Sequence, residues 1–592
     1  MAARLTAYVV VAIVAATLIA GLIVGAQRDD NDGPVDLIVT NATVYTADRR
    51  GTTAEAVAVR GNQILRVGSN REIVRLQRPQ TVVVNAGGGV VVPGFNDAHV
   101  DLIAGGLELT AIDLAGADTA DDIIDRVKSW SEANPAAPWV IGKGWTPEHF
   151  KGGLPTRRML DRVVPDRPAV FRGADAGTPA VWVNSRALKL AGITRTTRDP
   201  RGVITREGRS GEPAGVQRGT VAAIIAAQVP RPSPEDRLQA LRLAITEANA
   251  HGVTSAQNTA SSCEDDLDLF DSVRRAGEMT LRVYCAAAVD PSQIKTESDL
   301  APLNDLRVRY PDDPVFKTGA LAFTVDGPLE QRQAALLDVY ADDQTAAPAL
   351  VDPDQLNRAI RLADAAGWQV VTEANGDGAV RLALNAYAHA IRSNRAPARG
   401  RRHRIEQLAL VDAADGLRFG PLGVAASLQP PLITTDAFAS LVQTLGPDRA
   451  ERVYPVTELA QHTRLLLGSG WRGADEESLD PLQVLDRAVN GVPPESAGGD
   501  TGAEPPAKIA GLKIKAAIDA YTSTAAWGSF DDQRKGTISQ GMLADLVVLS
   551  EDVLTTPSKL KSAAVVATIF DGKIVYQRDS HALTAPAPSL QH

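Results

Sequence analysis

Cysteine and histidine are both scarce in this chain, which has 592 residues but only two cysteines and eight histidines. Two cysteines exclude a disulfide-rich scaffold and any CxxC metal site. Cys263 and Cys285 can pair as a disulfide if the protein lies outside the cytoplasm, or they can remain two isolated thiols. The sequence leaves both interpretations open.

Several signatures of catalysis and of nucleotide binding are also missing. The chain has no GxSxG serine motif, no GxxxxGK[ST] phosphate loop and no GxGxxG after a strand. Acidic residues outnumber basic ones by 71 to 61, which gives a net charge of −10. This acidic balance, together with the lack of a basic patch with interleaved aromatic residues, argues against a nucleic acid as the main partner.

The longest apolar run lies at the start of the chain, over residues 5–26. As a helix it is long enough to cross the ~30 Å hydrocarbon core of a bilayer, and Arg4 before it favours an N-terminus inside. A cleaved signal peptide is the alternative, because Val24-Gly25-Ala26 loosely fits a cleavage site, but the run exceeds the usual signal core. We therefore predict a transmembrane anchor and linker over residues 1–33, in a single-pass plasma-membrane protein whose bulk lies outside the cytoplasm.

Short β-type segments occupy both ends of the remaining chain. They include Leu37-Ile38-Val39 near the start, and Lys573-Ile574-Val575-Tyr576 after the hairpin turn Asp571-Gly572. We therefore predict that residues 34–92 and 535–580 together build one small β-sandwich. The tail over residues 581–592 is expected to be disordered.

Between these ends, over residues 93–534, strand-like apolar runs alternate with helix-like runs. Strand candidates are residues 139–143, 169–172, 252–257, 281–289, 315–325, 368–373, 404–408, 423–429 and 465–468. Helix candidates include residues 234–250, 354–366 and 378–393. Repeated strand-then-helix over about 440 residues favours a parallel sheet covered by helices, and the length and repeat number fit a (β/α)8 barrel with insertions. The predicted fold class is thus α/β, a TIM-like barrel plus a small β-sandwich.

The most informative stretch is Pro93-Gly94-Phe95-Asn96-Asp97-Ala98-His99-Val100-Asp101, which follows an apolar run. Side chains two positions apart on a strand point the same way, so we expect His99 and Asp101 to face the same side. The stretch resembles the first barrel strand of the amidohydrolase superfamily, in which Pro-Gly-Phe-x-Asp-x-His-x-His supplies two histidine metal ligands. In this chain Asp101 stands in place of the second histidine.

Further motifs resemble the branch of that superfamily that includes N-substituted formamide deformylase, often named amidohydrolase family 3. In chain order, they include Gly144-Trp145, Trp182-Val183-Asn184-Ser185, Asp326-Gly327-Pro328-Leu329, Glu373-Ala374-Asn375-Gly376-Asp377, Arg402-His403-Arg404-Ile405-Glu406, Ser427-Leu428-Gln429-Pro430, Gly468-Ser469 and Gly541-Met542-Leu543-Ala544-Asp545-Leu546. The likeness extends over residues 35–576. One such motif is weak evidence, but this many in the right order and spacing identify the fold.

The resemblance implies metal ligands at the carboxyl ends of barrel strands, where the metal activates water for attack on a C–N bond. Five of the six ligand positions are substituted in this chain. The residues found there are Asp101, Glu373 and Gln407 in place of histidines, Ala322 in place of a lysine, and Gly470 in place of an aspartate. Lys317, five residues before Ala322, would face the opposite way on a regular strand.

The substitution at Gly470 is the strongest argument against the family's hydrolytic chemistry. The aspartate that the family has at this position binds metal and takes the proton from the attacking water, and glycine can do neither. The substitutions at Ala322 and Gln407 remove further metal ligands. The main hypothesis is therefore a membrane-anchored pseudoenzyme without a cofactor, which acts as a binding protein or as a subunit of a membrane complex. The resemblance also implies that the chain can form a homodimer.

The polar groups that remain leave two alternatives for the pocket. His99, Asp101 and Glu373 can bind one divalent ion, Zn²⁺ or Mn²⁺, in a rebuilt one-metal site of a hydrolase for amides, formamides or other non-peptide C–N bonds. They can instead form a polar plug, hydrogen-bonded to one another and to water. Together with Gln407, these three residues are the predicted lining of the pocket.

Overall fold

The computed structural model describes residues 34–578, except for residues 152, 174–179, 200–202, 260–262, 330, 431–434, 473–477 and 492–510. It also leaves out the side chains of residues 209, 263–265 and 435–439. The predicted anchor and the predicted tail both lie outside the described residues. Among the helices that are described, none is long and apolar enough to cross a membrane.

Eight parallel strands form one sheet that curves into a nearly closed barrel, in the order β22-β21-β20-β19-β18-β17-β16-β8. The strands are β8 (Phe95–Val100), β16 (Val253–Asn258), β17 (Arg282–Ala288), β18 (Phe316–Thr324), β19 (Gln369–Ala374), β20 (Arg404–Gln407), β21 (Ala425–Leu428) and β22 (Leu465–Leu467). The chain that leaves β22 lies against β8, because the amide of Gly470 donates to the carbonyl of His99 (3.0 Å). The predicted parallel barrel is confirmed.

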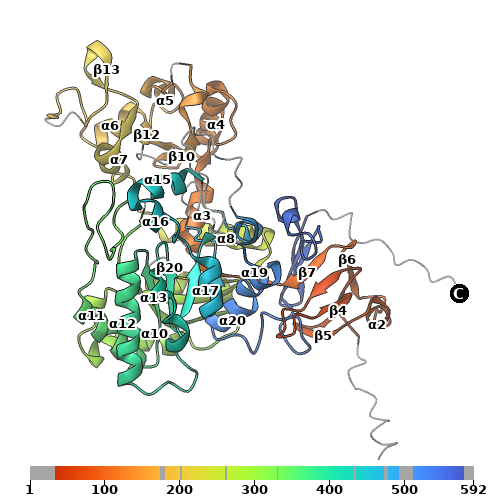
Figure 1. Cartoon of the computed structure of the whole chain (residues 1–592). Helices are drawn as coiled ribbons and strands as arrows, with labels where there is room; N and C mark the ends of the chain where they lie inside the picture. Colours follow the sequence, from red (N-terminus) through yellow and green to blue (C-terminus); the bar gives the residue numbers. More distant parts are fainter. Residues whose placement is uncertain are drawn as a thin grey trace, which may run out of the picture.

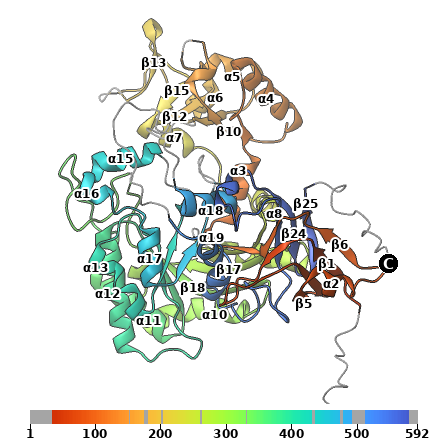
Figure 2. The same ribbon diagram turned by 45° about the vertical axis from the view of Figure 1, so that its right-hand side comes forward.

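Helices cover the outside of this barrel, as Figures 1 and 2 show. Three of them are α8 (Pro234–Ala250), α11 (Pro353–Ala365) and α12 (Asp377–Ser393). Helix α8 begins with a capping box between Ser233 and Asp236, and Asp352 caps α11. Their apolar residues recur at helical spacing and are buried, which explains why the sequence pattern located these helices to within about two residues.

A smaller sheet, in the order β15-β12-β11-β10-β9, stands apart from the barrel. Its strands are β9 (Ile112–Asp113), β10 (Val140–Trp145), β11 (Ala169–Gly173), β12 (Ala180–Val183) and β15 (Val216–Arg218). The expected barrel strands over residues 139–143 and 169–172 are therefore part of a different sheet. An apolar strand followed by a helix has the same sequence pattern in either sheet, so the pattern could not separate the two.

This smaller sheet has its own aromatic core, in which Trp182 contacts both Phe150 and Phe171. Its helices are α4 (Ala120–Ala133), α5 (Arg157–Val163), α6 (Ser185–Leu190) and α7 (Gly219–Ala226). In Figure 1 this unit lies above the barrel, and α3 (Leu102–Thr110) leads into it directly from β8. A bidentate ion pair between Arg172 on β11 and Glu108 on α3 joins the two parts.

The two ends of the chain supply the strands of two further sheets, in the orders β5-β4-β1-β6 and β25-β24-β23-β7-β2-β3. The strands are β1 (Leu37–Thr40), β2 (Thr43–Tyr45), β3 (Thr53–Ala54), β4 (Ala56–Arg60), β5 (Gln63–Gly68), β6 (Val82–Asn85), β7 (Val90–Pro93), β23 (Leu546–Leu549), β24 (Val565–Phe570) and β25 (Lys573–Gln577). The two sheets share an apolar core. Arg282 of β17 pairs with Asp545 (2.6 Å), which ties this part to the barrel.

Cys285 lies buried in β17 and is disulfide-bonded. Cys263 opens helix α9 (Cys263–Arg275), but its side chain lies outside the described part of the structure. The sequence left open whether these two cysteines pair with each other, and that question falls partly outside what the structure describes.

Candidate metal centre at the mouth of the barrel

Three potential metal ligands meet where the barrel strands end. They are His99 of β8, Glu373 of β19 and Glu406 of β20, and one ligand atom from each lies within 4.8 Å of the others. All strands of a parallel barrel point the same way, so side chains far apart in the sequence converge at their carboxyl ends. His99 and Glu406 are fully buried, and Glu373 is partly exposed at the mouth.

The ring of His99 is held by a set of buried hydrogen bonds. Nδ1 of His99 lies 2.6 Å from Oε2 of Glu406. The hydroxyl of Thr259 lies 2.9 Å from the same nitrogen and donates to Oε2 of Glu406 at 3.1 Å. On the other side, Nε of Arg404 donates to Oε1 of Glu406 at 2.7 Å. The result is a buried row of alternating charge behind the imidazole.

Electrostatics at this row favour a positive charge on the imidazole. Burial alone would lower the pKa of His99, but the charge and hydrogen bond of Glu406, with help from Glu373, outweigh burial and raise it. Burial alone would raise the pKa of Glu406. The charges of Arg404 and His99 outweigh burial, so the pKa of Glu406 is lowered. Two carboxylates around one imidazole therefore create a place where a cation is stabilised.

Glu373 stands at the outer edge of the group. The hydroxyl of Thr324 donates to its Oε2 at 3.1 Å. Burial raises the pKa of Glu373 and the nearby charge of Glu406 adds to this effect, whereas His99 and Arg472 oppose it. A carboxyl group in this setting can carry a proton at a higher pH than an exposed glutamate does.

Asp101 does not belong to this group, although the sequence analysis placed it beside His99. Strand β8 ends at Val100, and Asp101 is the N-cap of α3, where its side chain accepts a hydrogen bond from the amide of Ala104 (3.0 Å). The rule that alternate residues face the same side holds only within a strand, and the strand ends between the two residues. Glu406 takes the place that Asp101 was expected to fill.

Gln407 lies beside His99, with its Nε2 at 3.4 Å from Nε2 of the imidazole. Its backbone is left-handed (φ 72°), and so is that of Leu408 (φ 55°). Residues other than glycine rarely adopt this conformation, which costs about 1–2 kcal/mol per residue. Strained backbone of this kind is common at functional sites, so its presence here supports the assignment of a pocket.

Ala322 and Gly470 supply no ligand. Ala322 packs inside the barrel against small and aromatic side chains that include Tyr284 and Ala320. Gly470 has φ 72°, a conformation that favours glycine, and it lies directly against His99. An aspartate at this position would have to adopt the same left-handed backbone.

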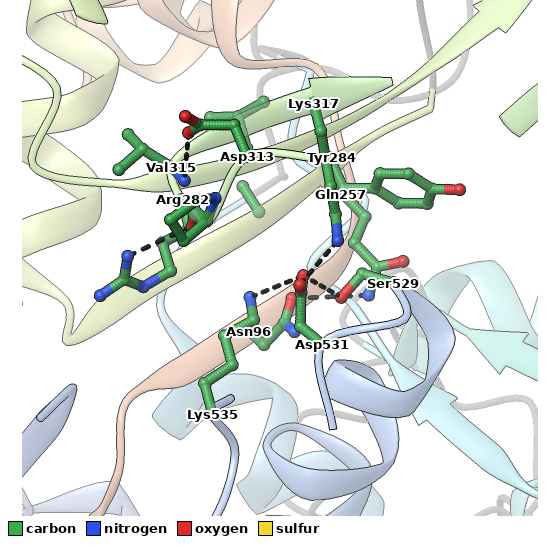
Figure 3. A pocket seen from close by; sticks show the side chains of 13 residues that line it. Asn96, Gln257, Arg282, Tyr284, Asp313, Val315, Lys317, Ser529, Asp531 and Lys535 are labelled. Carbon is green, nitrogen blue, oxygen red and sulfur yellow. Dashed lines mark hydrogen bonds and ion pairs between the residues drawn. The ribbon is translucent and has the colours of Figure 1, made fainter. Parts of the chain in front are cut away.

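Lys317 faces the interior of the barrel, contrary to expectation. The pairing of β17 with β18 moves from Cys285↔Thr318 to Ala286↔Ala320, so Gly319 is an extra residue in a β-bulge that reverses the alternation. Nζ of Lys317 nevertheless lies far from the mouth, near the amino-terminal ends of these strands. There it binds Asp531 (2.6 Å) and Asp312 (3.0 Å) beside a small cavity, shown in Figure 3. It cannot replace the ligand that Ala322 lacks.

Asp326 positions the elements around Glu373. Its carboxylate accepts hydrogen bonds from the amides of Asn375 (2.8 Å), Gly376 (2.8 Å) and Ala335 (2.9 Å). These bonds fix the turn between β19 and α12, directly after Glu373. Burial raises the pKa of Asp326 to about 6, although the amide hydrogen bonds act in the opposite direction.

Comparison with known proteins supports the family resemblance. A sequence model described as the amidohydrolase family matches residues 82–576. The chain belongs to the amidohydrolase family. Its barrel, with the candidate ligands at the carboxyl ends of the strands, is the arrangement that the family resemblance implied.

Three curated relatives of this amidohydrolase-family protein match it over nearly their whole length. Protein LONG AFTER FAR-RED 3 of Arabidopsis thaliana is 32% identical over 91% of this chain and 91% of the relative. Putative amidohydrolase YtcJ of Bacillus subtilis (strain 168) is 29% identical over 90% and 98%. N-substituted formamide deformylase of Arthrobacter pascens is 26% identical over 92% and 98%.

Solved structures show the same fold. An uncharacterized metal-dependent hydrolase from Pyrococcus horikoshii has a TM-score of 0.67 at 23% identity and covers 88% of this chain and 98% of its own. A second such hydrolase, from Pyrococcus furiosus, has a TM-score of 0.66 at 22% identity, with 88% and 99% covered. At this level of identity the likeness shows the fold alone.

Proposed function

We propose that this amidohydrolase-family protein is a metal-dependent hydrolase of non-peptide C–N bonds in amides or formamides. The observation that carries the proposal is the meeting of His99, Glu373 and Glu406 at the barrel mouth. The relatives named putative amidohydrolase and N-substituted formamide deformylase support the same reaction class. We prefer this function to a pseudoenzyme, because Glu406 adds a carboxylate that is not among the ligand positions of the family motif.

The chemistry of these donors fits one divalent ion. One imidazole and two carboxylates are ligands that Zn²⁺ and Mn²⁺ accept in proteins. The raised pKa of His99 reflects the pull of the carboxylates on a positive charge.

A bound divalent ion would supply a water of lowered pKa and would polarise the substrate carbonyl. His99, Glu373 and Glu406 would hold the ion, and Arg404 would keep Glu406 ionised and oriented. Glu373, the partly exposed carboxylate at the mouth, would take up a proton from the attacking water and return it to the leaving nitrogen. Gly470 offers no side chain for that transfer, so Glu373 assumes the role of the family's aspartate.

The experiment is hydrolysis of an N-alkylformamide and of a simple amide by protein purified without chelators, with and without added Mn²⁺ or Zn²⁺. We expect turnover that disappears in the chelated protein and returns on addition of the ion. His99→Ala should abolish it, whereas His389→Ala, on the outer helix α12, should leave it unchanged. A protein that stays inactive on both substrates with either ion would contradict the proposal.

The membrane anchor, the membrane complex and the homodimer stay predictions from the sequence. A chain held at the outer face of the plasma membrane by residues 5–26 would act on substrates outside the cytoplasm. Fractionation of cells that express the full chain, followed by protease treatment of intact cells, tests this placement.

A further inference from the structure

Three arginines and two aromatic rings form one continuous row on the surface of the protein. Cζ of Arg399 lies 4.2 Å from the centroid of the Phe530 ring, and Cζ of Arg402 lies 4.6 Å from the same centroid. Arg402 also lies 5.1 Å from the ring centroid of Trp527, and Arg464 lies 4.6 Å from that centroid. We call these five residues the arginine–aromatic row. The linear sequence does not show it, because its members come from three separate segments of the chain.

The arginine–aromatic row lies at the amino-terminal end of the barrel, opposite the candidate metal centre. Arg402 comes two residues before β20 and Arg464 comes directly before β22, whereas the candidate ligands stand where the strands end. Trp527 belongs to α20 (Ser523–Gly528), a helix that contacts β22 and β8. In Figure 1, α20 lies toward the lower side of the barrel and the unit of the smaller sheet lies above it.

Positive charge is in excess along the row. Arg402 pairs with Asp532 at 2.6 Å. Arg399 and Arg464 form no ion pair with any carboxylate that the structure describes, and Arg399 instead donates to two backbone carbonyls at 2.9 Å. Both of these arginines are exposed, and the two aromatic rings are half-buried. Exposed guanidinium groups without carboxylate partners beside partly exposed aromatic rings are typical of a surface that binds anions.

The backbone is strained at two members of the row. Arg402 has φ 50° and Phe530 has φ 60°, and both values lie in the left-handed region that residues other than glycine rarely adopt. Such conformations persist only where the surrounding structure holds them, and they cluster at functional sites. The fold therefore fixes the positions of these two residues.

The first strand of the chain starts at the same end of the barrel as the row. The carboxylate of Asp36, just before β1, accepts a hydrogen bond from the amide of Gly61 at 2.6 Å. The next residue, Asn62, donates to Asp571 at 3.3 Å. Asp571 in turn pairs with Arg282 at 2.8 Å, and Arg282 is the first residue of β17. These contacts connect the start of β1 to the amino-terminal end of a barrel strand.

We propose that the arginine–aromatic row docks on the phosphate headgroups of an anionic membrane, so that the mouth of the barrel opens away from the bilayer. Guanidinium groups bind phosphate oxygens through two parallel hydrogen bonds, and tryptophan is favoured at the bilayer interface. The seven residues 27–33 between the predicted anchor and the described chain reach at most about 25 Å, which keeps this end of the barrel beside the membrane. The net charge of −10 over the whole chain argues against a nucleic acid as the anionic partner. The inference does not depend on the reaction at the mouth.

The first test measures amide hydrogen exchange in the full chain, reconstituted in phosphatidylcholine vesicles with and without phosphatidylglycerol. We expect residues 395–402 and 523–530 to exchange at least about fivefold more slowly when phosphatidylglycerol is present. The protection should disappear in about 0.5 M salt, which screens the charge of the headgroups. Equal exchange in the two kinds of vesicle would overturn the inference.

Variants of the row test whether its charges account for the protection. Arg464→Gln should remove most of it, and Arg399→Gln should do the same. Arg399→Gln also breaks hydrogen bonds to backbone carbonyls, so Arg464→Gln decides if the other variant does not fold. Arg158→Gln, with a side chain 75% exposed on the unit of the smaller sheet, is the matched control and should keep full protection. Unchanged protection in Arg464→Gln would contradict docking through the row.

Sedimentation with vesicles separates this inference from the predicted anchor. A chain that spans the bilayer stays with vesicles of either composition in high salt, whatever the row does. If residues 5–26 do not anchor the chain, docking still predicts sedimentation with phosphatidylglycerol vesicles in low salt and release in high salt, and Arg464→Gln should stay in solution. Stronger protection of residues 395–402 by soluble poly-L-glutamate or by RNA than by these vesicles would assign the row to another anionic macromolecule and would overturn the inference.

Discussion

Oε2 of Glu406 lies 2.6 Å from Nδ1 of His99, and both side chains are fully buried. The contact joins β20 to β8, two strands that are not neighbours in the barrel sheet. Behind Glu406, the guanidinium of Arg404 pairs with the other carboxylate oxygen and also hydrogen-bonds Gln257. The imidazole at the mouth is therefore oriented by charges that lie inside the barrel.

Removal of Arg404 should destabilise the protein strongly. Arg404→Met removes the guanidinium partner of the buried Glu406 carboxylate, which costs about 3–5 kcal/mol. Chemical denaturation measures the change in the free energy of unfolding. The double variant Arg404→Met/Glu406→Gln should recover part of the loss, because the unpaired charge is gone. Arg309→Met, which breaks an exposed pair with Asp268, is the control and should have little effect. Equal stabilities for the two single variants would contradict this account of the barrel interior.

Asp326→Asn should weaken the turn that positions Glu373. The carboxylate accepts three backbone N–H groups, and a carboxamide turns its own N–H donors toward some of them. We expect a loss of about 1–3 kcal/mol in the free energy of unfolding, together with weaker metal binding. Asp354→Asn, at the exposed first turn of α11, is the matched control. Unchanged stability in Asp326→Asn would mean that these hydrogen bonds do not hold the turn.

His251 should make stability depend on pH in the mildly alkaline range. It lies between Glu247 (3.1 Å) and Asp480 (3.7 Å). Burial lowers its pKa, but these carboxylates outweigh burial and raise it to about 9. Because the folded pKa exceeds the unfolded value of about 6.5, the stabilisation is complete below that value and is lost as pH rises through about 9.

The test for His251 is denaturation at pH 6 and pH 10. The partly exposed setting screens the charges, so we expect a contribution of about 1 kcal/mol, which His251→Asn should remove at pH 6 but not at pH 10. A variant that loses the same free energy at both values would show that packing, not charge, accounts for the effect.

Restoring the family's aspartate should cost stability, because Gly470 has a left-handed backbone. Gly470→Ala should lower the free energy of unfolding by about 1 kcal/mol, and Gly470→Asp by a similar amount. Gly416→Ala is the control, since its backbone is helical and an added Cβ would meet only the end of the Glu458 side chain at 3.7 Å. If Gly470→Asp is as stable as the wild type, the glycine is not required by the backbone.

Much of the fold could be predicted from local pattern, because buried strands and amphipathic helices have distinct periodicities. The barrel strand near Phe95 and the helix after Asp352 are examples. Membership of a sheet could not be predicted in the same way. Residues 139–143 and 169–172 have the pattern of barrel strands, but their own aromatic core holds them in a separate sheet.

The candidate site could be predicted less completely, because small irregularities in strands change which side chains meet. The end of β8 at Val100 removes Asp101 from the group, and a bulge at Gly319 turns Lys317 inward. Glu406 could not be predicted from the family motif, because the motif has its metal ligand at position 407. The sequence did contain one signal for Glu406. Arg404 and Glu406 are two positions apart on a strand, so they lie on the same face, and charged side chains on a buried face need partners.

The most direct measurement is a titration of Mn²⁺ into metal-free protein, followed by electron paramagnetic resonance. The account predicts about one bound ion per chain in the wild type and in Asp101→Asn, and loss of tight binding in His99→Ala and Glu373→Gln. Circular dichroism of each variant would show that the fold is intact. Absence of binding in the wild type, or binding that depends on Asp101 and not on Glu373, would contradict the metal centre described above.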